Sequence, residues 1–166
     1  GIYGPVSQLI TVKEKYSAAI ETALGAAVQN IVVDNETDAK RAMGFLKERR
    51  AGRATFLPIT AIKGRVLSEQ GLDDQYGFVS IASDLVSYDN KYSEIIRWLL
   101  GRTAVAEDID SAIAIAKKYS YRFRIVTLDG QVINAGGSMT GGSRVQNAGI
   151  LSRGNEIERL RSEERR

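Results

Sequence analysis

A glycine-rich segment, Gly136-Gly137-Ser138-Met139-Thr140-Gly141-Gly142, holds the residues whose types and spacing could do chemistry. Backbone amides in such a segment can bind phosphate oxygens, because residues without a Cβ allow close approach. The P-loop pattern places Lys directly after its last glycine, and here Ser143 stands in that place. The dinucleotide pattern Gly-x-Gly-x-x-Gly does not occur in the chain. Nucleotide binding is therefore disfavoured.

Docking of another polypeptide is the second interpretation of this segment. Asp129-Gly130 predicts a tight β-hairpin shortly before it. A glycine-rich edge strand offers free N–H and C=O groups to a partner strand, and its small side chains let two sheets meet. A surface loop without a partner has the same composition. Docking and loop both stay open on composition alone.

The composition excludes most enzyme classes. With 166 residues, 43% of them hydrophobic and 26% charged, the chain can bury the core of one globular domain. It has no Cys and no His, which excludes disulfides, thiolate chemistry, Cys/His zinc sites and His-dependent triads. The acidic residues are scattered, so we expect no catalytic residue and no metal site. Asp108 or Asp110 is expected to cap a helix.

Two basic clusters suggest contact with nucleic acid. Lys117, Lys118 and Arg122 alternate with aromatic residues, a composition typical of platforms that bind single strands. The same stretch spans a predicted helix end, where cations interact favourably with the helix dipole. A second cluster lies within residues 47–53. The net charge is only +3, and solvated helix faces are the simpler explanation of both clusters.

Apolar periodicity predicts alternating helices and strands around these residues. Residues 1–5 have turn composition, and 60–83 are the least regular part. A helix is expected after Asn35-Glu36-Thr37-Asp38, with Ala39, Ala42, Met43 and Leu46 as its apolar stripe. The other predicted helices are 15–24, 92–100 and 110–119, and the predicted strands are 28–33, 53–59, 78–81, 103–106 and 123–128, followed by Val132 and Ile133. Residues 6–12 are predicted to form a short strand or an irregular entry segment.

The two halves of the chain resemble each other. Tyr16-Ser17-x-x-Ile20-x-x-x-Leu24-Gly25 matches Tyr92-Ser93-x-x-Ile96-x-x-x-Leu100-Gly101. A strand, a helix and a basic strand follow in each half, and residues 53–59 correspond to 122–128. The pattern predicts a pseudo-symmetric pair of α/β subdomains, about 1–90 and 91–150. Chance similarity of two helix-glycine-strand units is the alternative.

The last residues differ in composition from the rest. Ile150, Leu151, Ile157 and Leu160 lie near a seven-residue spacing among charged residues, which predicts that 151–166 begin a coiled coil. A solvated terminal helix fits this pattern equally well. Because the sequence starts at Gly1 and stops inside this pattern, we expect it to be a piece of a longer protein. No signal peptide and no apolar run long enough to span a bilayer is found.

Taken together, these motifs resemble the hinge domain of SMC (structural maintenance of chromosomes) proteins, most closely the bacterial homodimeric kind. The resemblance spans nearly the whole chain. The residues that carry it are Gly1-x-x-Gly4 with Val6 to Leu9, Ala18-x-Ile20-x-x-Ala23-Leu24-Gly25, Asn30-Ile31-Val32-Val33, Gly52-Arg53-Ala54-Thr55-Phe56-Leu57-Pro58, Val126-Thr127-Leu128-Asp129-Gly130 and the glycine segment.

The resemblance implies a mixed α/β domain (residues 1–150) of two related subdomains with small mixed sheets, flanked by coiled-coil ends. Two hinges would form a homodimer that joins two arms of an ATPase acting on chromosomal DNA. The family's dimer-interface glycines fall on Gly136, Gly137, Gly141 and Gly142. ATP, magnesium and accessory subunits would belong to head domains outside this fragment, which would itself be no enzyme. A cytoplasmic, nucleoid-associated protein without membrane contact is implied.

Many relatives follow the glycine segment with lysines that contact DNA, whereas here only Arg144 is basic. We therefore expect DNA binding to be weak and to fall steeply with salt. The DNA contacts predicted are Arg144, Lys117, Lys118 and Arg122. The alternative function is a DNA-binding module whose dimerisation is incidental, and a third interpretation is a nucleotide-binding α/β domain.

Overall fold

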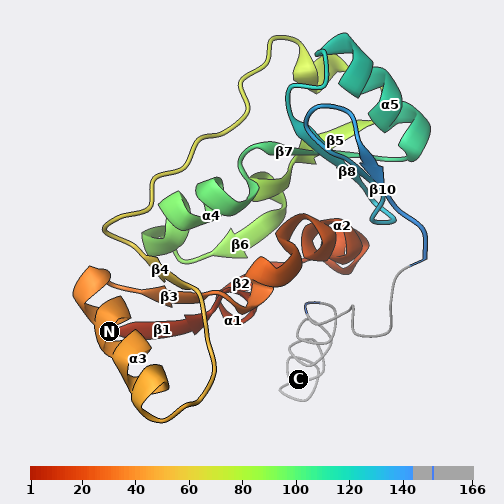
Figure 1. The fold of residues 1–166 in the computed structure, drawn as a ribbon. Coiled ribbons are helices and arrows are strands. Elements are labelled where there is room, and N and C mark those ends of the chain that lie inside the picture. The colour runs from red at the N-terminus through yellow and green to blue at the C-terminus, as the bar shows by residue number, and fades with distance from the viewer. Residues whose placement is uncertain (144–150, 152–166) are drawn as a thin grey trace, which may run out of the picture.

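The fold is described from a computed structural model for residues 1–143 and Leu151. Two sheets of unequal size lie on either side of a two-stranded ladder, and two central helices pack between them (Figure 1). The fold is mixed α/β with small mixed sheets, as predicted. The predicted coiled-coil start lies outside the described residues, apart from Leu151. This residue is helical and buried, and its N–H donates to Glu21 Oε1 (2.8 Å).

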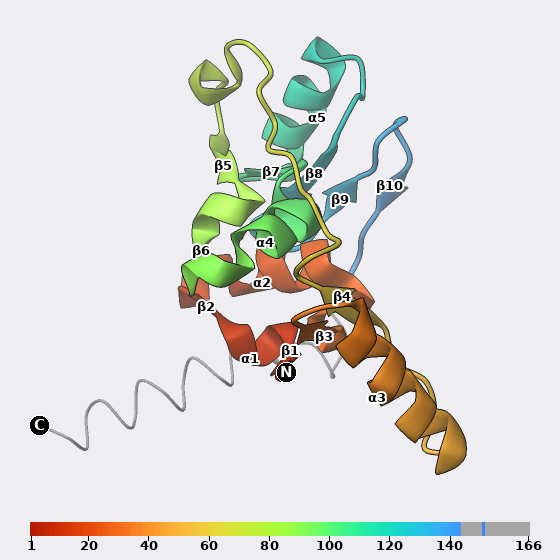
Figure 2. The same cartoon turned by 90° about the vertical axis from the view of Figure 1, so that its left-hand side faces the viewer.

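The first sheet has the strand order β1-β3-β4. β1 (Ile2–Pro5) runs antiparallel to β3 (Ile31–Val33), which runs parallel to β4 (Phe56–Pro58). α3 (Glu36–Glu48) makes the crossover between β3 and β4, and it begins where Asn35 accepts a hydrogen bond from the N–H of Asp38 (2.9 Å). Away from the sheet, α3 projects from the body of the molecule (Figure 2).

The second sheet repeats this plan and extends it. Its order is β10-β9-β8-β7-β5, in which β7 (Thr103–Ala106) and β8 (Arg124–Thr127) are parallel and joined by α5 (Ile109–Lys118). β5 (Phe78–Ile81) runs antiparallel to β7. β9 (Val132–Ile133) and β10 (Met139–Thr140) add two antiparallel strands beyond β8. The first sheet has no counterpart of these two strands within the described residues.

A two-stranded ladder joins the halves, and its register is symmetric. β2 (Ile10–Val12) pairs with β6 (Val86–Tyr88) through Ile10↔Tyr88, Thr11↔Ser87 and Val12↔Val86. Each strand follows a short helical turn, α1 (Val6–Leu9) in the first half and the 3₁₀ turn η3 (Ala82–Leu85) in the second. Exchanging the two strands therefore reproduces the pairing, with Thr11 and Ser87 at the centre of a pseudo-two-fold relation.

The central helices α2 (Glu14–Leu24) and α4 (Ser93–Leu100) follow these strands and carry the matching tyrosine-to-glycine motifs. Ile20 and Ile96, at equivalent positions of the motif, are both buried in one core with the residues of the ladder. A second core lies between α5 and the second sheet. Burial of these apolar faces holds the halves together, at roughly 25 cal/mol for each Å² removed from water.

Most of the predicted elements are present, with shifts at the ends. In the predicted strand 6–12, Val6–Leu9 instead form the helix α1, and only Ile10–Val12 are extended. The prediction of a turn over residues 1–5 was wrong, because Ile2–Pro5 form β1 against β3. Val28 lies in the 3₁₀ helix η1 (Gly25–Gln29) rather than in the strand. β5 lies within the range assigned to the first subdomain but pairs with β7, so the repeated elements restart at Phe78. The remaining 3₁₀ helices are η2 (Leu72–Asp74) and η4 (Asn90–Tyr92).

An extended connection, residues 59–71, crosses α4 on its way from β4 to η2 and is called the strap below (Figure 1). Close backbone packing fixes it. A Cβ on Gly64 would overlap the backbone of Arg97 and Trp98, and a Cβ on Gly101 would overlap the carbonyl oxygen of Arg65. The N–H of Leu67 donates to Gly101 O (2.8 Å). None of the helices described is long and apolar enough to cross a membrane.

Candidate functional site

The glycine segment forms the outer strand of the second sheet together with the turn that precedes it. β10 pairs with β9 through Met139↔Ile133 and Thr140↔Val132. The Asn134 N–H donates to Ser138 O (2.7 Å), and the Gly137 N–H donates to Asn134 O (2.9 Å), which closes the turn. Met139 and Thr140 of the segment therefore form a short strand, and Gly136 and Gly137 lie in the turn before it; docking of a partner stays a prediction.

The backbone conformation or the packing within one chain requires glycine at each of these four positions. Gly136, Gly137 and Gly142 have φ values of +90°, +112° and +129°, which L side chains rarely adopt. Gly141 lies under the side chain of Gln131, so that a Cβ would overlap Gln131 Oε1. The side-chain amide of Gln131 makes two hydrogen bonds to the backbone of Gly142. The Gly142 N–H donates to Gln131 Oε1 (2.9 Å), and Gln131 Nε2 donates to Gly142 O (3.1 Å). The glycines shape the strand.

The outer edge of β10 is unpaired within the described residues. Ser138 and Thr140 turn their backbone groups toward β9, as the Asn134–Ser138 hydrogen bond shows for the first of them. Backbone direction alternates along a strand, so the N–H and C=O groups of Met139 and Gly141 point away from β9. The side chain of Met139 is 57% exposed. β10 thus offers a short ladder and one apolar side chain to a partner.

β4 is one of the two edge strands of the first sheet, with β1 at the other edge. The Ile31 N–H donates to Thr55 O (2.9 Å) and the Ile59 N–H donates to Val33 O (2.9 Å), so these residues face β3. By the same alternation, the N–H and C=O of Phe56 point away from the sheet. Pro58 next to it has no N–H to donate, which suits an edge strand. β4 is therefore an edge of the first sheet at which the backbone of Phe56 is available to another strand.

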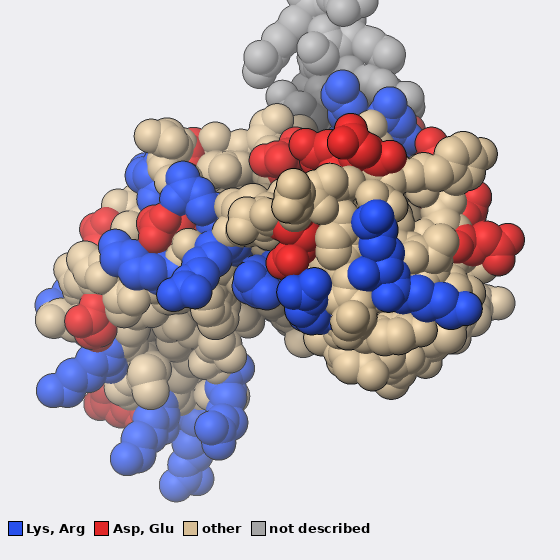
Figure 3. Space-filling view, turned by 90° about the horizontal axis from the view of Figure 1, so that it is seen from above, with Lys and Arg blue, Asp and Glu red and all other residues tan. Residues whose placement is uncertain are grey.

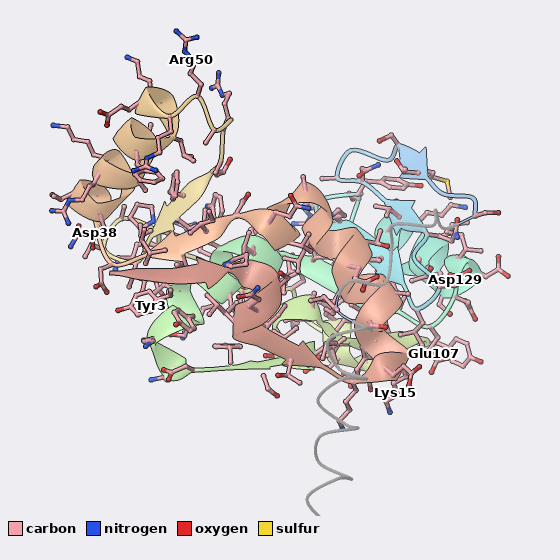
Figure 4. The ribbon with its side chains drawn as sticks, turned by 90° about the horizontal axis from the view of Figure 1, so that it is seen from below. Tyr3, Lys15, Asp38, Arg50, Glu107 and Asp129 are labelled. Atoms are coloured by element: carbon pink, nitrogen blue, oxygen red, sulfur yellow. The ribbon has the colours of Figure 1, made fainter. Side chains whose placement is uncertain are left out.

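Beside β4, α3 carries an apolar stripe that is less buried than its counterpart on α5, since Ala42 and Leu46 are half-buried and Met43 is exposed. Aligning the capping residues Asn35 and Asp108 matches Ala42, Met43 and Leu46 with Ile115, Ala116 and Tyr119. Those three residues of α5 are buried against the second sheet. The first sheet stops at β4, and Met43 is 57% exposed. The predicted stripe is present on α3, and Met43 is its exposed member. Figure 4 shows α3 extending from the body, with Arg50 at its far end.

The residues predicted to contact DNA are spread over one end of α5 and the tail. Lys117 and Lys118 are exposed in the last turn of α5, where cations are favoured by the helix dipole. Arg122 Nε donates to Tyr119 O (3.0 Å), and its Nη1 lies 4.0 Å from Glu69 Oε2, so its side chain serves the helix end. Arg144 lies outside the described residues. Their contact with DNA stays a prediction.

Asp108 caps the N-terminus of α5, as predicted. Asp108 Oδ1 accepts from the Ser111 N–H (2.8 Å), and this bond lowers the pKa of the Asp108 carboxyl below its usual value. Asp110 lies in the first turn of the same helix. Within the described part of the chain, no group of three or more acidic side chains is placed to hold a metal ion.

Comparison with known proteins identifies the family. The family model described as the flexible hinge domain of SMC proteins matches residues 1–116. The chain belongs to the SMC hinge family. The chromosome partition protein Smc of Bacillus subtilis is 43% identical over 162 residues, which cover 95% of this chain and 14% of that protein. Smc of Methanocaldococcus jannaschii is 46% identical over 143 residues, 86% of this chain and 12% of that protein.

Solved SMC hinges have the same fold. An asymmetric dimer of the Geobacillus stearothermophilus SMC hinge domain matches with a TM-score of 0.91 and 48% identity, covering 98% of this chain and 66% of that one. The Pyrococcus furiosus SMC hinge domain matches with a TM-score of 0.74 and 34% identity, covering 89% and 76%. The matched region is a dimerisation module and not a catalytic or nucleotide-binding domain. The chain spans about a seventh of the curated Smc relatives.

Proposed function

We propose that this chain is the homodimerisation hinge of a bacterial-type SMC ATPase, and that it joins two coiled-coil arms into one V- or ring-shaped molecule acting on chromosomal DNA. ATP, magnesium and accessory subunits would be bound by head domains beyond this chain, at the nucleoid in the cytoplasm. Residues 1–150 would form the hinge, and 151–166 would start the C-terminal arm. The observation that carries the proposal is a pair of open, complementary edges, β10 and β4, in one chain.

The internal repeat specifies how the two edges meet. In the second half, β9 covers the edge of β8, and α5 packs over both. β4 and α3 are the counterparts of β8 and α5, but nothing covers β4 within the described residues. A β10 strand from a second copy, placed beside β4, would take the position that β9 has in the second half. Its Met139 would then lie near the exposed stripe of α3.

This arrangement closes on itself. In a two-fold dimer, β10 of each copy meets β4 of the other, so the same contact forms twice. A contact between two β10 strands would leave β4 and Met43 exposed. The proposal therefore assigns Gly136, Gly137, Gly141 and Gly142 an indirect part at the interface, because they set the shape of the strand that docks.

Two proline substitutions test which edges pair. Met139→Pro and Phe56→Pro each remove an N–H that points away from its own sheet, so each should weaken the dimer and leave the fold intact. Met139→Ala is the matched control, since it keeps the N–H. Analytical ultracentrifugation should show that the parent is dimeric and that each proline variant alone is largely monomeric.

Mixing the two proline variants separates the possible pairings. A mixed dimer has one intact contact, because the Phe56→Pro chain supplies a normal β10 and the Met139→Pro chain supplies a normal β4. We expect the mixture to form heterodimers more tightly than either variant forms homodimers. A mixture no tighter than its components would reject pairing of β10 with β4, and a monomeric parent would reject the proposed function.

A further inference from the structure

Tyr121, just after α5, has a backbone conformation that is rare for its residue type. Its φ is +56°, in the left-handed region where a Cβ crowds the backbone. Arg50 (φ +52°) and Ser120 (φ +58°) are the other described residues besides glycine with a positive φ. A bulky residue stays in such a conformation only where its surroundings fix it, and such residues cluster at functional sites. The contacts of Tyr121 therefore point to what its conformation serves.

The ends of the two crossover helices, α3 and α5, differ at this residue. After α3, the Ala51 N–H donates to Leu46 O (2.9 Å), and after α5 the Tyr121 N–H donates to Ala116 O (2.9 Å). The residue before each of these donors is left-handed, so both helix ends follow the Schellman pattern. Tyr121 adds a second left-handed residue, which Ala51 does not. The additional strain thus belongs to the half of the chain that carries the hairpin of β9 and β10.

Tyr121 contacts the turn between β9 and β10 in two ways. The Gly136 N–H donates to Tyr121 O (2.8 Å), and the backbone conformation of Tyr121 decides where this carbonyl points. The ring of Tyr121 lies beside Gly137, where a Cβ would lie 3.5 Å from ring atom Cδ1. The end of α5 is itself fixed, because the Tyr119 hydroxyl donates to Gln70 O of the strap (2.7 Å). The turn before β10 is therefore attached to a fixed part of the second half.

The hairpin has few other attachments at this end. β9 and β10 pair over only two residues each, and so short a two-stranded ladder is marginal by itself. Among the described residues, the hydrogen bond to Tyr121 O is the one that joins residues 134–138 to another element. Charged side chains are spread over the molecule as seen from above (Figure 3), but residues 134–142 include none, so side-chain ion pairs cannot hold the turn. Gln131 holds only the far end of β10, at Gly142.

We propose that Tyr121 is the positioning residue of β10. Its left-handed backbone aims the carbonyl at Gly136, its ring supports Gly137, and together they hold β10 where β4 of a partner can pair with it. The inference rests on the proposed pairing of β10 with β4 and adds the residue that prepares β10 for it. The strain is tolerated because a strand that is already in place loses less conformational freedom when it binds.

Tyr121→Asn tests this role, because asparagine adopts the left-handed conformation more easily than tyrosine and has no ring. Hydrogen exchange of the Gly136 and Gly137 amides should become faster, whereas exchange of the β8 amides should not change. In the Met139→Pro background, this exchange is measured without the dimer. If the turn is then in place about a third of the time in each chain, the dissociation constant of the dimer should rise about tenfold, because both chains must be competent at once. Tyr121→Phe keeps the ring and should behave as the parent does.

Ser120→Gly is the matched control for backbone strain. Ser120 has nearly the same φ as Tyr121, but its side chain is exposed and its backbone makes no hydrogen bond to the turn. Glycine removes the strain at this position, so the melting temperature should rise. Exchange at Gly136 and Gly137 and the dissociation constant should stay as in the parent.

The outcomes separate this role from the proposed function. Unchanged exchange in Tyr121→Asn would overturn the role of Tyr121, and so would an equal effect in Tyr121→Phe or Ser120→Gly. Faster exchange with an unchanged dissociation constant would also overturn it, because docking would then not need a fixed turn. A monomeric parent would instead reject the proposed function, while exchange in the Met139→Pro background would still decide whether Tyr121 holds the turn.

Discussion

Replacing Met43 by glutamate should dissociate the dimer without unfolding the chain. Met43 is 57% exposed in one chain, and its counterpart in the second half, Ala116, is buried. If β10 of a partner covers β4, the stripe of α3 becomes interior and Met43 is buried with it. Glutamate suits an exposed helix position as well as methionine does, so the isolated chain should change in stability by less than about 0.5 kcal/mol.

The size of the effect follows from the exposed fraction of the side chain. Complete burial of a methionine is worth roughly 1.5–3 kcal/mol, so the 57% still exposed corresponds to about 0.9–1.7 kcal/mol. A two-fold dimer contains this contact twice, which gives about 1.7–3.4 kcal/mol, or a dissociation constant roughly 20- to 300-fold higher. An unpaired carboxylate in the interface adds a desolvation cost, so these figures are a lower bound.

Phe45→Glu is the control on the same helix. Phe45 is 51% exposed, nearly as much as Met43, and its ring lies 4.3 Å from the Arg49 guanidinium. Its counterpart on α5 is Lys118, which faces solvent, so Phe45 should stay outside the interface. Sedimentation velocity across a concentration series, with thermal unfolding of each variant, measures both quantities. Equal dissociation in the two variants, or an unchanged dimer in Met43→Glu, would show that burial of the counterpart residue on α5 does not identify the interface residues of α3.

Two further predictions concern the local geometry. Gly141→Ala should displace the Gln131 amide and remove two hydrogen bonds to Gly142, each worth at most about 0.5–1.5 kcal/mol, so that β10 opens more often. Hydrogen exchange of the Thr140 and Gly142 amides should speed up equally in Gln131→Ala, and an additive effect in the double variant would contradict the shared cause. The pKa of Asp108 is lowered in the folded chain, so its charged form stabilises α5 above the usual carboxyl pKa, and this stabilisation is lost as pH falls through the lowered value. The melting temperature of the parent should therefore approach that of Asp108→Asn between about pH 5 and pH 2, and parallel curves would show that the cap does not titrate.

The regular elements could be predicted from sequence because their signals are local. Gly25 ends α2 with a positive φ (+54°), Asp108 caps α5, and Asp129-Gly130 forms the turn between β8 and β9. The prediction failed at β1, which has turn composition and becomes a strand because β3 offers it a ladder. Pairing between distant segments is a tertiary effect that composition does not encode.

The docking role of the glycine segment was predicted from composition and resemblance, whereas its receiving edge was not. Composition showed glycines that permit close approach, but the positive φ values and the Gln131 clamp show that they first serve their own strand. β4 could have been found from sequence, because the repeat aligns 53–59 with 122–128, and only the second copy continues into a hairpin. The hairpin that has no counterpart in the first half was the sequence signal for the open edge at β4.

The repeat also explains why a chain with two similar halves should dimerise instead of aggregating. Each half needs a strand beyond its parallel pair to complete the sheet under its crossover helix. The second half supplies that strand itself as β9 and carries one more, β10, whereas the first half ends at β4. One surplus strand and one missing strand in the same chain are matched when two copies exchange them, so the contact forms twice about a two-fold axis. The asymmetry between the halves thus favours a closed contact between two chains, because each chain carries one surplus strand and one place for it.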